Sequence, residues 1–166
     1  MNIIIPFFEK QLKEEAVTTR KMLAIIPEDK YDWQPHAKSM TVRRLAAHIA
    51  ELPGWIPMAI DTDVLDFAEN DYKATPIANN AELLAVFEQN QKKAEEALPN
   101  TTDEYLQNLW TMKNGDQIFL WLSKQDVIRQ ALSQTIHHRA QLGVFLRLLN
   151  IPIPGSYGPS ADEMGF

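Results

Sequence analysis

The sequence predicts an all-α protein, an antiparallel four-helix bundle with a short β-hairpin before its last helix. Four segments carry apolar residues at spacings of three and four, which is typical of amphipathic helices. One long irregular connection lies among them, and such an arrangement favours a bundle. Strand and helix patterns do not alternate, so nothing in the sequence supports a parallel sheet. With 166 residues the chain has the size of one domain, residues 1–166.

The first two helices are bounded by proline and by capping residues. The first is expected from about Ile5 to Ile26, because Pro27 cannot continue a helix. The second begins near Ser39 or Thr41, since either hydroxyl can cap a helix N-terminus. Two prolines then interrupt the pattern, and the chain is expected to continue with kinks as far as Ile60.

The third helix follows the long connection, residues 61–76, which is acidic and irregular. It is expected from about Asn80 to Leu98, and Asn79 followed by Glu82 resembles a capping box. Its apolar positions at helical spacing are expected to face inward: Leu84, Phe87, Gln91, Ala94 and Leu98.

A hairpin and the last helix complete the expected elements. Asn114 and Gly115 lie between two short strand-capable runs, which predicts a two-residue β-hairpin turn. The fourth and longest helix is expected over residues 124–150. Residues 151–166 contain three prolines and three glycines, so an extended tail is predicted. Ile151, Ile153 and Tyr157 are expected to pack back on the bundle, with covering of a cavity as the alternative.

Composition excludes several classes of protein. The chain has no cysteine, which excludes disulfides, a thiol nucleophile and thiolate metal sites and makes a cytoplasmic location the default. The net charge is −6 and no basic run exceeds two residues, so we expect no nucleic-acid partner. No apolar stretch reaches the roughly 18–20 residues of a membrane span, so no membrane association is expected.

Two of the four histidines, His48 and His138, are expected to face the interior from different helices. His48 lies at the edge of the apolar stripe of the second helix, one turn from Leu45. On a helical wheel His138 falls within the apolar arc of the fourth helix, and His137 lies about 100° away on its flank. Facing helices of a bundle are a common place for a metal site, and neutral imidazole is the commonest ligand.

A catalytic zinc site requires three protein ligands and an open position. The third candidate is Gln134, one turn before His138, whose amide oxygen is a weak neutral donor. The alternative is that both inward histidines are core residues whose ring nitrogens bond to carbonyl groups. We expect His36 to be solvated in its proline-flanked loop and His137 to lie at an edge or interface.

Several stretches of the chain resemble the DinB-like (DinB/YfiT) proteins. They are KSMTVRRLAAHIAELPGW from Lys38, QTIHHRAQL from Gln134 and IPIPGSYGPSADE from Ile151, and the hairpin also fits. The resemblance implies a bundle of the DinB/YfiT type, often a homodimer, with a divalent metal such as zinc or nickel. In that pattern three histidines bind the metal, one from the second helix and two from the fourth at positions four apart.

The chain departs from that pattern at one ligand. His48 matches the first family ligand and His138 the last, but the remaining position is Gln134. An amide oxygen is a poorer ligand for zinc or nickel than imidazole. The departure at Gln134 leaves three interpretations open. The site binds metal more weakly, water completes the coordination, or the metal site has been lost. Ala140 also replaces the glycine usual after the arginine of the motif.

Two functions follow as hypotheses. The first is a metal-dependent transferase or hydrolase in which the metal lowers the pKa of a bound thiol or water. Any thiol would be a low-molecular-weight cosubstrate, and Arg139 is either a group that neutralises an anionic small-molecule substrate or a solvated surface residue. The second is a non-catalytic, stress-related dimeric bundle with a degenerate metal site. The family name refers to DNA damage-inducible expression and describes no chemistry.

Overall fold

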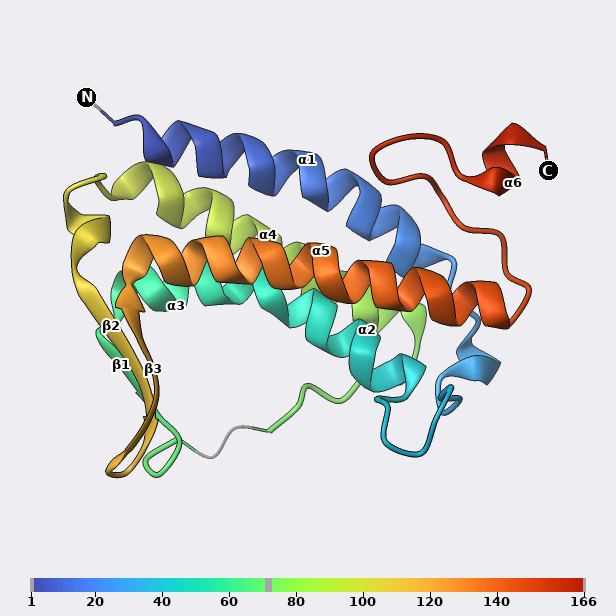
Figure 1. Ribbon diagram of the computed structural model, residues 1–166, viewed down its shortest axis with the longest axis horizontal. Coiled ribbons are helices and arrows are strands. Elements are labelled where there is room, and N and C mark those ends of the chain that lie inside the picture. The colour runs from blue at the N-terminus through green and yellow to red at the C-terminus, as the bar shows by residue number, and fades with distance from the viewer. Residues whose placement is uncertain (1, 71–72, 166) are drawn as a thin grey trace.

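The computed structural model in Figure 1 describes residues 2–70 and 73–165. Most of these residues are helical: α1 (Ile4–Ala24), α2 (Val42–Glu51), α3 (Trp55–Asp61), α4 (Asn80–Ala97), α5 (Lys124–Leu148) and the short α6 (Ala161–Met164). Three strands form one small sheet: β1 (Val64–Asp66), β2 (Leu109–Asn114) and β3 (Gln117–Ser123). The mainly helical character predicted from the sequence is confirmed.

The long helices lie side by side, with the sheet at one end (Figure 1). α1 packs against α4 and α5, and α2 and α3 pack against the same two helices from another side. A short 3₁₀ turn over Leu52–Gly54 joins α2 to α3, where the prolines predicted kinks. Thr41 caps α2 by accepting a hydrogen bond from the amide of Arg44, so the second of the two predicted caps is the one used.

The α4 region differs from the prediction in two details. Asn79 caps the helix through the amide of Glu82, at 2.9 Å, but the Glu82 carboxylate returns to the amide of Ala78 and not to that of Asn79. Leu83 is fully buried, whereas Leu84, which was expected to face inward, is half-buried. The rest of the predicted inward stripe, Phe87, Gln91, Ala94 and Leu98, is buried as expected.

The sheet contains a strand that the sequence did not predict. β2 and β3 are antiparallel, and because Asn114 pairs with Gln117 the turn is Gly115 and Asp116, one residue later than predicted. Gly115 has a φ of 58°, a conformation that favours glycine. β1 lies within the connection expected to be irregular and pairs in parallel with β2. Residues 71 and 72 of that connection, and Phe166 of the tail, lie outside the described residues.

The tail also gains structure that was not predicted, because α6 forms within it under a capping box of Ser160 and Glu163. Ile151 and Ile153 pack against the core as expected. The ring of Tyr157 is largely exposed, its hydroxyl donates to Glu15 of α1, and the guanidinium of Arg139 lies 5.7 Å from the ring centroid. No helix among the described residues is long and apolar enough to cross a membrane.

A belt of buried polar residues divides the core into two apolar clusters. One cluster lies at the sheet end and includes Trp110, and the other surrounds α2 and includes Leu45. On α1, α4 and α5 the buried polar positions fall between the residues of the two clusters: Glu15, Thr19, Gln91, Thr135, His138 and Arg139. Polar groups buried at this depth require partners, and the candidate ligand His138 is one of them.

Candidate functional site

An open cleft of about 520 Å³ lies beside α2 and α3, bounded on its far side by the connection that contains β1. Its apolar wall includes Trp55, Met58 and Phe67, and His48 and Glu51 contribute polar groups. A volume of this size is in the range of small-molecule sites, which combine an apolar lining with a few polar groups. The cleft therefore has the size and lining of a ligand site with one imidazole at its edge.

The structure brings His48 and His138 together across α2 and α5. The two ring centroids are 4.7 Å apart and the rings meet edge to face, at 75°. His138 is buried, at 9 % exposure, while His48 is half-buried and lines the cleft. Two imidazoles ninety positions apart in the chain thus meet at the junction of the buried belt and the open cleft.

Both ring nitrogens of His138 lie against glutamine side chains of the same helix. Nδ1 is 2.8 Å from Oε1 of Gln141, and Nε2 is 2.7 Å from Oε1 of Gln134. A neutral imidazole has one donor and one acceptor nitrogen, so it cannot satisfy two facing oxygens. A second proton on the ring, a turned amide or a cation beside Nε2 would each resolve this conflict. The third of these arrangements would place the cation between Nε2 of His138 and Oε1 of Gln134.

The pKa of His48 lies below its ordinary value of 6.5. Burial is the largest cause, and the neighbouring His138 and Arg44 lower it further, against an opposing effect of Glu51. His48 also lines the cleft, so its ring is accessible to a ligand. The imidazole is therefore neutral near pH 7, with a lone pair available to a ligand.

Besides the two imidazoles, the sequence predicts one further metal ligand at this place, the amide oxygen of Gln134. No group of three or more histidine, aspartate or glutamate side chains in residues 2–70 and 73–165 is arranged to hold a metal ion. Gln134 is exposed, one turn before His138 on α5. A divalent ion bound here would have two imidazoles and one amide oxygen as protein ligands, with its remaining positions open.

The other two histidines lie where the sequence predicts. His36 is exposed in its loop, where Nδ1 accepts a hydrogen bond from the amide of Lys38 at 3.1 Å. His137 is exposed on the flank of α5, with its ring centroid 4.9 Å from that of His138. The wheel therefore distinguished the two adjacent histidines correctly, because neighbouring positions of a helix point about 100° apart.

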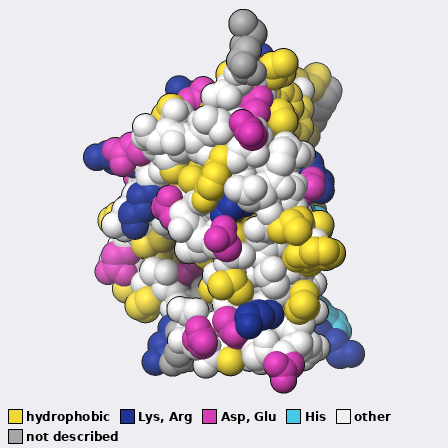
Figure 2. Space-filling model, turned by 90° about the vertical axis from the view of Figure 1, so that its left-hand side faces the viewer, with side chains coloured by type: hydrophobic (Ala, Val, Ile, Leu, Met, Phe, Trp, Pro, Cys, Tyr) yellow, Lys and Arg dark blue, Asp and Glu magenta, His cyan; other side chains and the backbone are white. Residues whose placement is uncertain are grey.

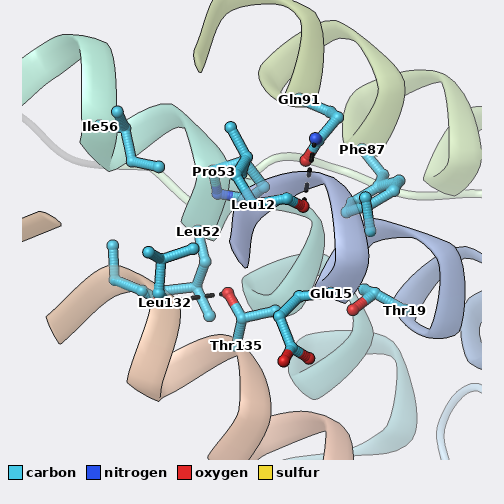
Figure 3. Close-up of a pocket in the computed structure, with 12 residues that line it drawn as sticks. Leu12, Glu15, Thr19, Leu52, Pro53, Ile56, Phe87, Gln91, Leu132 and Thr135 are labelled. Atoms are coloured by element: carbon cyan, nitrogen blue, oxygen red, sulfur yellow. Dashed lines mark hydrogen bonds between the residues drawn. The ribbon is translucent and has the colours of Figure 1, made fainter. Parts of the chain in front are cut away.

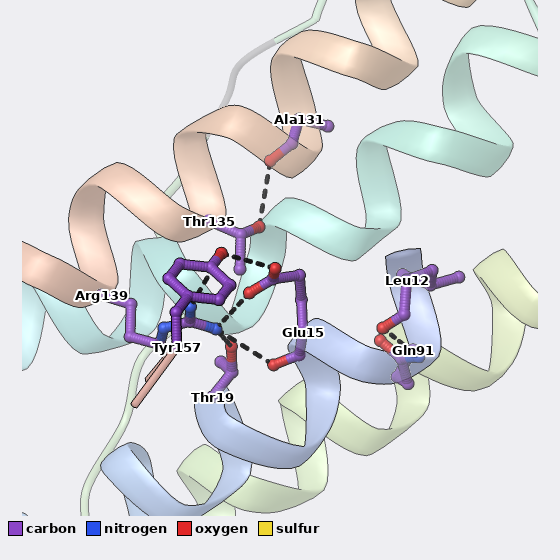
Figure 4. Close-up of polar contacts among 8 residues, drawn as sticks. All are labelled: Leu12, Glu15, Thr19, Gln91, Ala131, Thr135, Arg139 and Tyr157. Atoms are coloured by element: carbon purple, nitrogen blue, oxygen red, sulfur yellow. Dashed lines mark hydrogen bonds and ion pairs between the residues drawn. The ribbon is translucent and has the colours of Figure 1, made fainter. Parts of the chain in front are cut away.

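Arg139 was predicted either to neutralise an anionic substrate or to be a solvated surface residue, and the structure places it in neither role. It is buried, at 1 % exposure, and its guanidinium lies 2.6 Å from a carboxylate oxygen of Glu15 (Figure 4). The same guanidinium donates to the hydroxyl of Thr19 at 3.1 Å, and the hydroxyl of Tyr157 donates to Glu15 at 2.6 Å. Because its charge is used inside the bundle, Arg139 is a structural residue that joins α5 to α1 and the tail.

Figure 3 shows the small cavity beside this ion pair, with Glu15 and Thr135 on one side and Gln91 on the other. Its volume is about 10 Å³, close to the least that holds one water molecule. It cannot accept a substrate, so the candidate site is the open cleft at His48. The sequence analysis did not single out Glu15. Its position in the inward stripe, next to Leu12 and Thr19, could have indicated a buried carboxylate that requires a positively charged partner.

The chain is similar to known proteins both in sequence and in fold. The model of the DinB family matches residues 8–165. The "Uncharacterized protein YrdA" of Bacillus subtilis (strain 168) is 27% identical over 163 residues, with 94% of this chain and 89% of that protein covered.

Two solved structures are similar in fold. One is the DinB-like protein YjoA of Bacillus subtilis, with a TM-score of 0.69 and 19% identity, covering 90% of this chain and 96% of the other. The second is a DinB-like protein of Bacillus cereus ATCC 10987, with a TM-score of 0.69 and 20% identity, covering 90% and 95%.

Proposed function

The chain belongs to the DinB family, and from that premise we propose that it is a metal-dependent enzyme acting on a small molecule in the cleft beside His48. In this proposal the helices are the four-helix bundle of the DinB/YfiT type, and His48, Gln134 and His138 bind a divalent transition metal, zinc or nickel. The contact between the two imidazole rings, with centroids 4.7 Å apart, is the observation that carries the proposal.

Each residue has a separate role in the proposed site. His48 offers a neutral imidazole on the cleft side, because burial keeps its pKa low. Gln141 accepts the Nδ1 proton of His138, which orients that ring and leaves Nε2 as the ligand atom facing Gln134. The three donors leave coordination positions open for a substrate or water.

The metal, when bound, supplies Lewis acidity that lowers the pKa of a coordinated thiol or water. The chain contributes no thiol, so a transferase reaction would take its thiol from a low-molecular-weight cosubstrate. Trp55 and Phe67 give the substrate an apolar wall and exclude water from one side of it. We therefore propose transfer to or from a small thiol, or hydrolysis, as the reaction class.

The test is calorimetric titration of chelator-treated, untagged protein with zinc and with nickel. His48→Ala and His138→Ala should each lower the affinity at least tenfold, and Gln141→Ala should lower it roughly 10- to 100-fold as an orienting residue. His137→Ala is the matched control, since its ring is adjacent but exposed, and it should leave the affinity unchanged. Equal effects at positions 137 and 138 would refute the proposed ligand set.

A second candidate function rests on Gln134 itself, which stands where the family pattern has histidine. On that view the protein is a non-catalytic, stress-related dimer whose metal site has degenerated. The variant Gln134→His separates the two, because it restores the stronger donor at the same helix position. A large gain in zinc affinity over a weakly binding parent favours the degenerate site, and tight binding by the parent favours the enzyme.

A further inference from the structure

The floor of the cleft is a single helical face that runs along α2 and α3. Five lining residues follow one another at spacings of four, three, four and three: Arg44, His48, Glu51, Trp55 and Met58. Side chains at these spacings share one face, because each helical position turns by about 100°. The ionisable groups of the floor therefore lie on α2, and its apolar side chains lie on α3.

The connection on the far side of the cleft has the same polarity along its length. Leu65, at its start, packs against the same apolar cluster as the α3 residues of the floor, and Phe67 follows it. Lys73 and Thr75 line the cleft further along. The amide of Thr75 donates to Oε1 of Glu51 at 2.9 Å, which places this polar part of the connection beside α2. The cleft thus has an apolar end at α3 and a polar end at α2.

The polar end is positively charged, although the chain as a whole is acidic. Of the described residues that line the cleft, Arg44 and Lys73 are cationic and Glu51 is the one carboxylate. These two positive groups and one negative group give the lining a charge of +1, whereas the chain carries −6. The carboxylate is also the less accessible group, since 13% of the Glu51 side chain is exposed and 38% of that of Arg44. A charged ligand that enters the cleft therefore meets a local positive potential.

We propose that the substrate of this cleft is an apolar carboxylic acid in its anionic form. Its carboxylate binds at Arg44, and its apolar body lies against Trp55 and Phe67. This names the substrate class of the function proposed above and rests on that proposal for the reacting centre at His48. The neutralising role for which Arg139 was a candidate thus falls to a different arginine, because Arg139 is paired with Glu15 inside the bundle.

The spacing along the floor sets the shape of this substrate. At 1.5 Å per residue, Arg44 lies roughly 6 Å before His48 and Trp55 roughly 10 Å beyond it. The acidic group and the apolar body therefore lie on opposite sides of the reacting centre. A guanidinium binds a carboxylate through two parallel hydrogen bonds. The lining charge of +1 also matches the single charge of a carboxylate more closely than the two charges of a phosphate monoester.

A cationic substrate is the competing class, because aromatic rings beside a carboxylate can also hold a cation. In this cleft Glu51 already accepts a hydrogen bond from Thr75, and its other oxygen lies 3.8 Å from Nη1 of Arg44. A cationic ligand would have to enter beside Arg44 and Lys73, and like charges repel each other. The lining therefore favours an anion.

The test is calorimetric titration of the full chain with three probes of one shape but different charge: naphthylacetate, naphthylacetamide and naphthylethylammonium. A chelator is present throughout, so that no metal can attract the carboxylate. The anion should bind about tenfold more tightly than the neutral amide, as expected for a hydrogen-bonded charge pair, and the ammonium should bind most weakly. Added salt should reduce the preference for the anion.

The variant Arg44→Gln should abolish the preference for naphthylacetate over the amide, because it removes the charge and leaves a good helix former in its place. Arg43→Gln is the matched control. It removes the same charge from the neighbouring position, but the Arg43 guanidinium donates to Asp32 and to the carbonyl of Ile77, away from the cleft. It should leave the preference unchanged.

A second pair of variants tests where the apolar body binds. Phe67→Ala should weaken the anion and the amide alike, since it removes part of the apolar wall and no charge. Apolar side chains are also exposed at the sheet end of the molecule (Figure 2), and Trp121 of β3 is 64% exposed. Trp121→Ala is therefore the control, and it should change neither affinity.

Three results would overturn the proposal. They are a parent protein that binds the amide or the ammonium as tightly as the anion, a preference that survives Arg44→Gln or is lost equally in Arg43→Gln, and probe binding that depends on Trp121 and not on Phe67. A failure to bind zinc or nickel would remove the metal-dependent function but would leave these probe affinities unchanged, so the two proposals fail separately.

Discussion

Arg139 and Glu15 form an ion pair within the belt that divides the core. The Arg139 side chain is 2% exposed and that of Glu15 10%, and the pair is completed by Thr19 and Tyr157. Two charges removed from water are tolerated here because each has a partner and further hydrogen bonds. Removing one partner leaves the other charge buried alone, which is far more costly than losing a surface pair.

We predict that Arg139→Met lowers the free energy of unfolding by about 3–5 kcal/mol, the range for a broken buried pair. Urea denaturation at pH 7 measures it. Arg129→Met is the control, because its contact with Asp126 is on the surface, and it should cost at most about 1 kcal/mol. If the two variants lose the same amount, Arg139 does not have the structural role described.

The lowered pKa of His48 makes a second prediction at this scale. In the unfolded chain His48 takes up a proton near its ordinary pKa of 6.5, whereas in the folded protein it does so only at lower pH. Because the unfolded state binds the proton more readily, acid favours unfolding. The stability contribution is complete above pH 6.5 and is lost as the pH falls through the lower folded value. In metal-free protein, His48→Gln should flatten the decline in unfolding free energy between pH 7 and the onset of carboxylate titration. An identical pH profile in parent and variant would contradict the burial of this ring.

The tail is the element whose attachment is most clearly electrostatic. Asp162 accepts hydrogen bonds from the guanidinium of Arg147 and, at 2.9 Å, from the amide of Ile153. Arg147 and this amide lower the pKa of Asp162 from 3.8 to about 2. The carboxylate therefore joins α6 both to α5 and to the start of the tail, and it does so only in its ionised form.

Because the folded pKa of Asp162 is the lower one, its contribution is present above pH 3.8 and lost as the pH falls to about 2. We predict that Asp162→Asn is less stable than the parent at pH 5 and that the difference disappears by pH 2. Thermal unfolding at both pH values measures this. Asp29→Asn is the control, since that carboxylate makes an exposed contact with Lys30, and it should cost at most about 1 kcal/mol at pH 5.

Elements defined by local chemistry could be predicted from the sequence. Thr41 and Asn79 cap α2 and α4, and the wheel placed His138 inside and His137 on the flank. Elements that depend on contacts with distant parts of the chain could not be predicted from the sequence. β1 forms because β2 offers it an edge, and the N-terminus of α1 is capped by Asp103, which accepts hydrogen bonds from its first amides. Such contacts leave no periodic pattern in the chain.

At the scale of the whole molecule the same limit applies to the candidate site. The sequence could predict that His48 and His138 face inward, since each lies on or beside an apolar stripe. It could not predict Gln141 on the second nitrogen of His138, because an exposed glutamine has no hydrophobic signal. It also could not predict the burial of Arg139, which depends on Glu15 from α1 and Tyr157 from the tail meeting at one place.

The proposed enzymatic function requires a cation held between α2 and α5, at His48 and His138. The most direct measurement is an anomalous difference map at the zinc absorption edge, from crystals grown with zinc. We predict one peak within ligand distance of the rings of His48 and His138 and of Oε1 of Gln134. Density at surface carboxylates alone, with those three side chains arranged as in the metal-free protein, would contradict it.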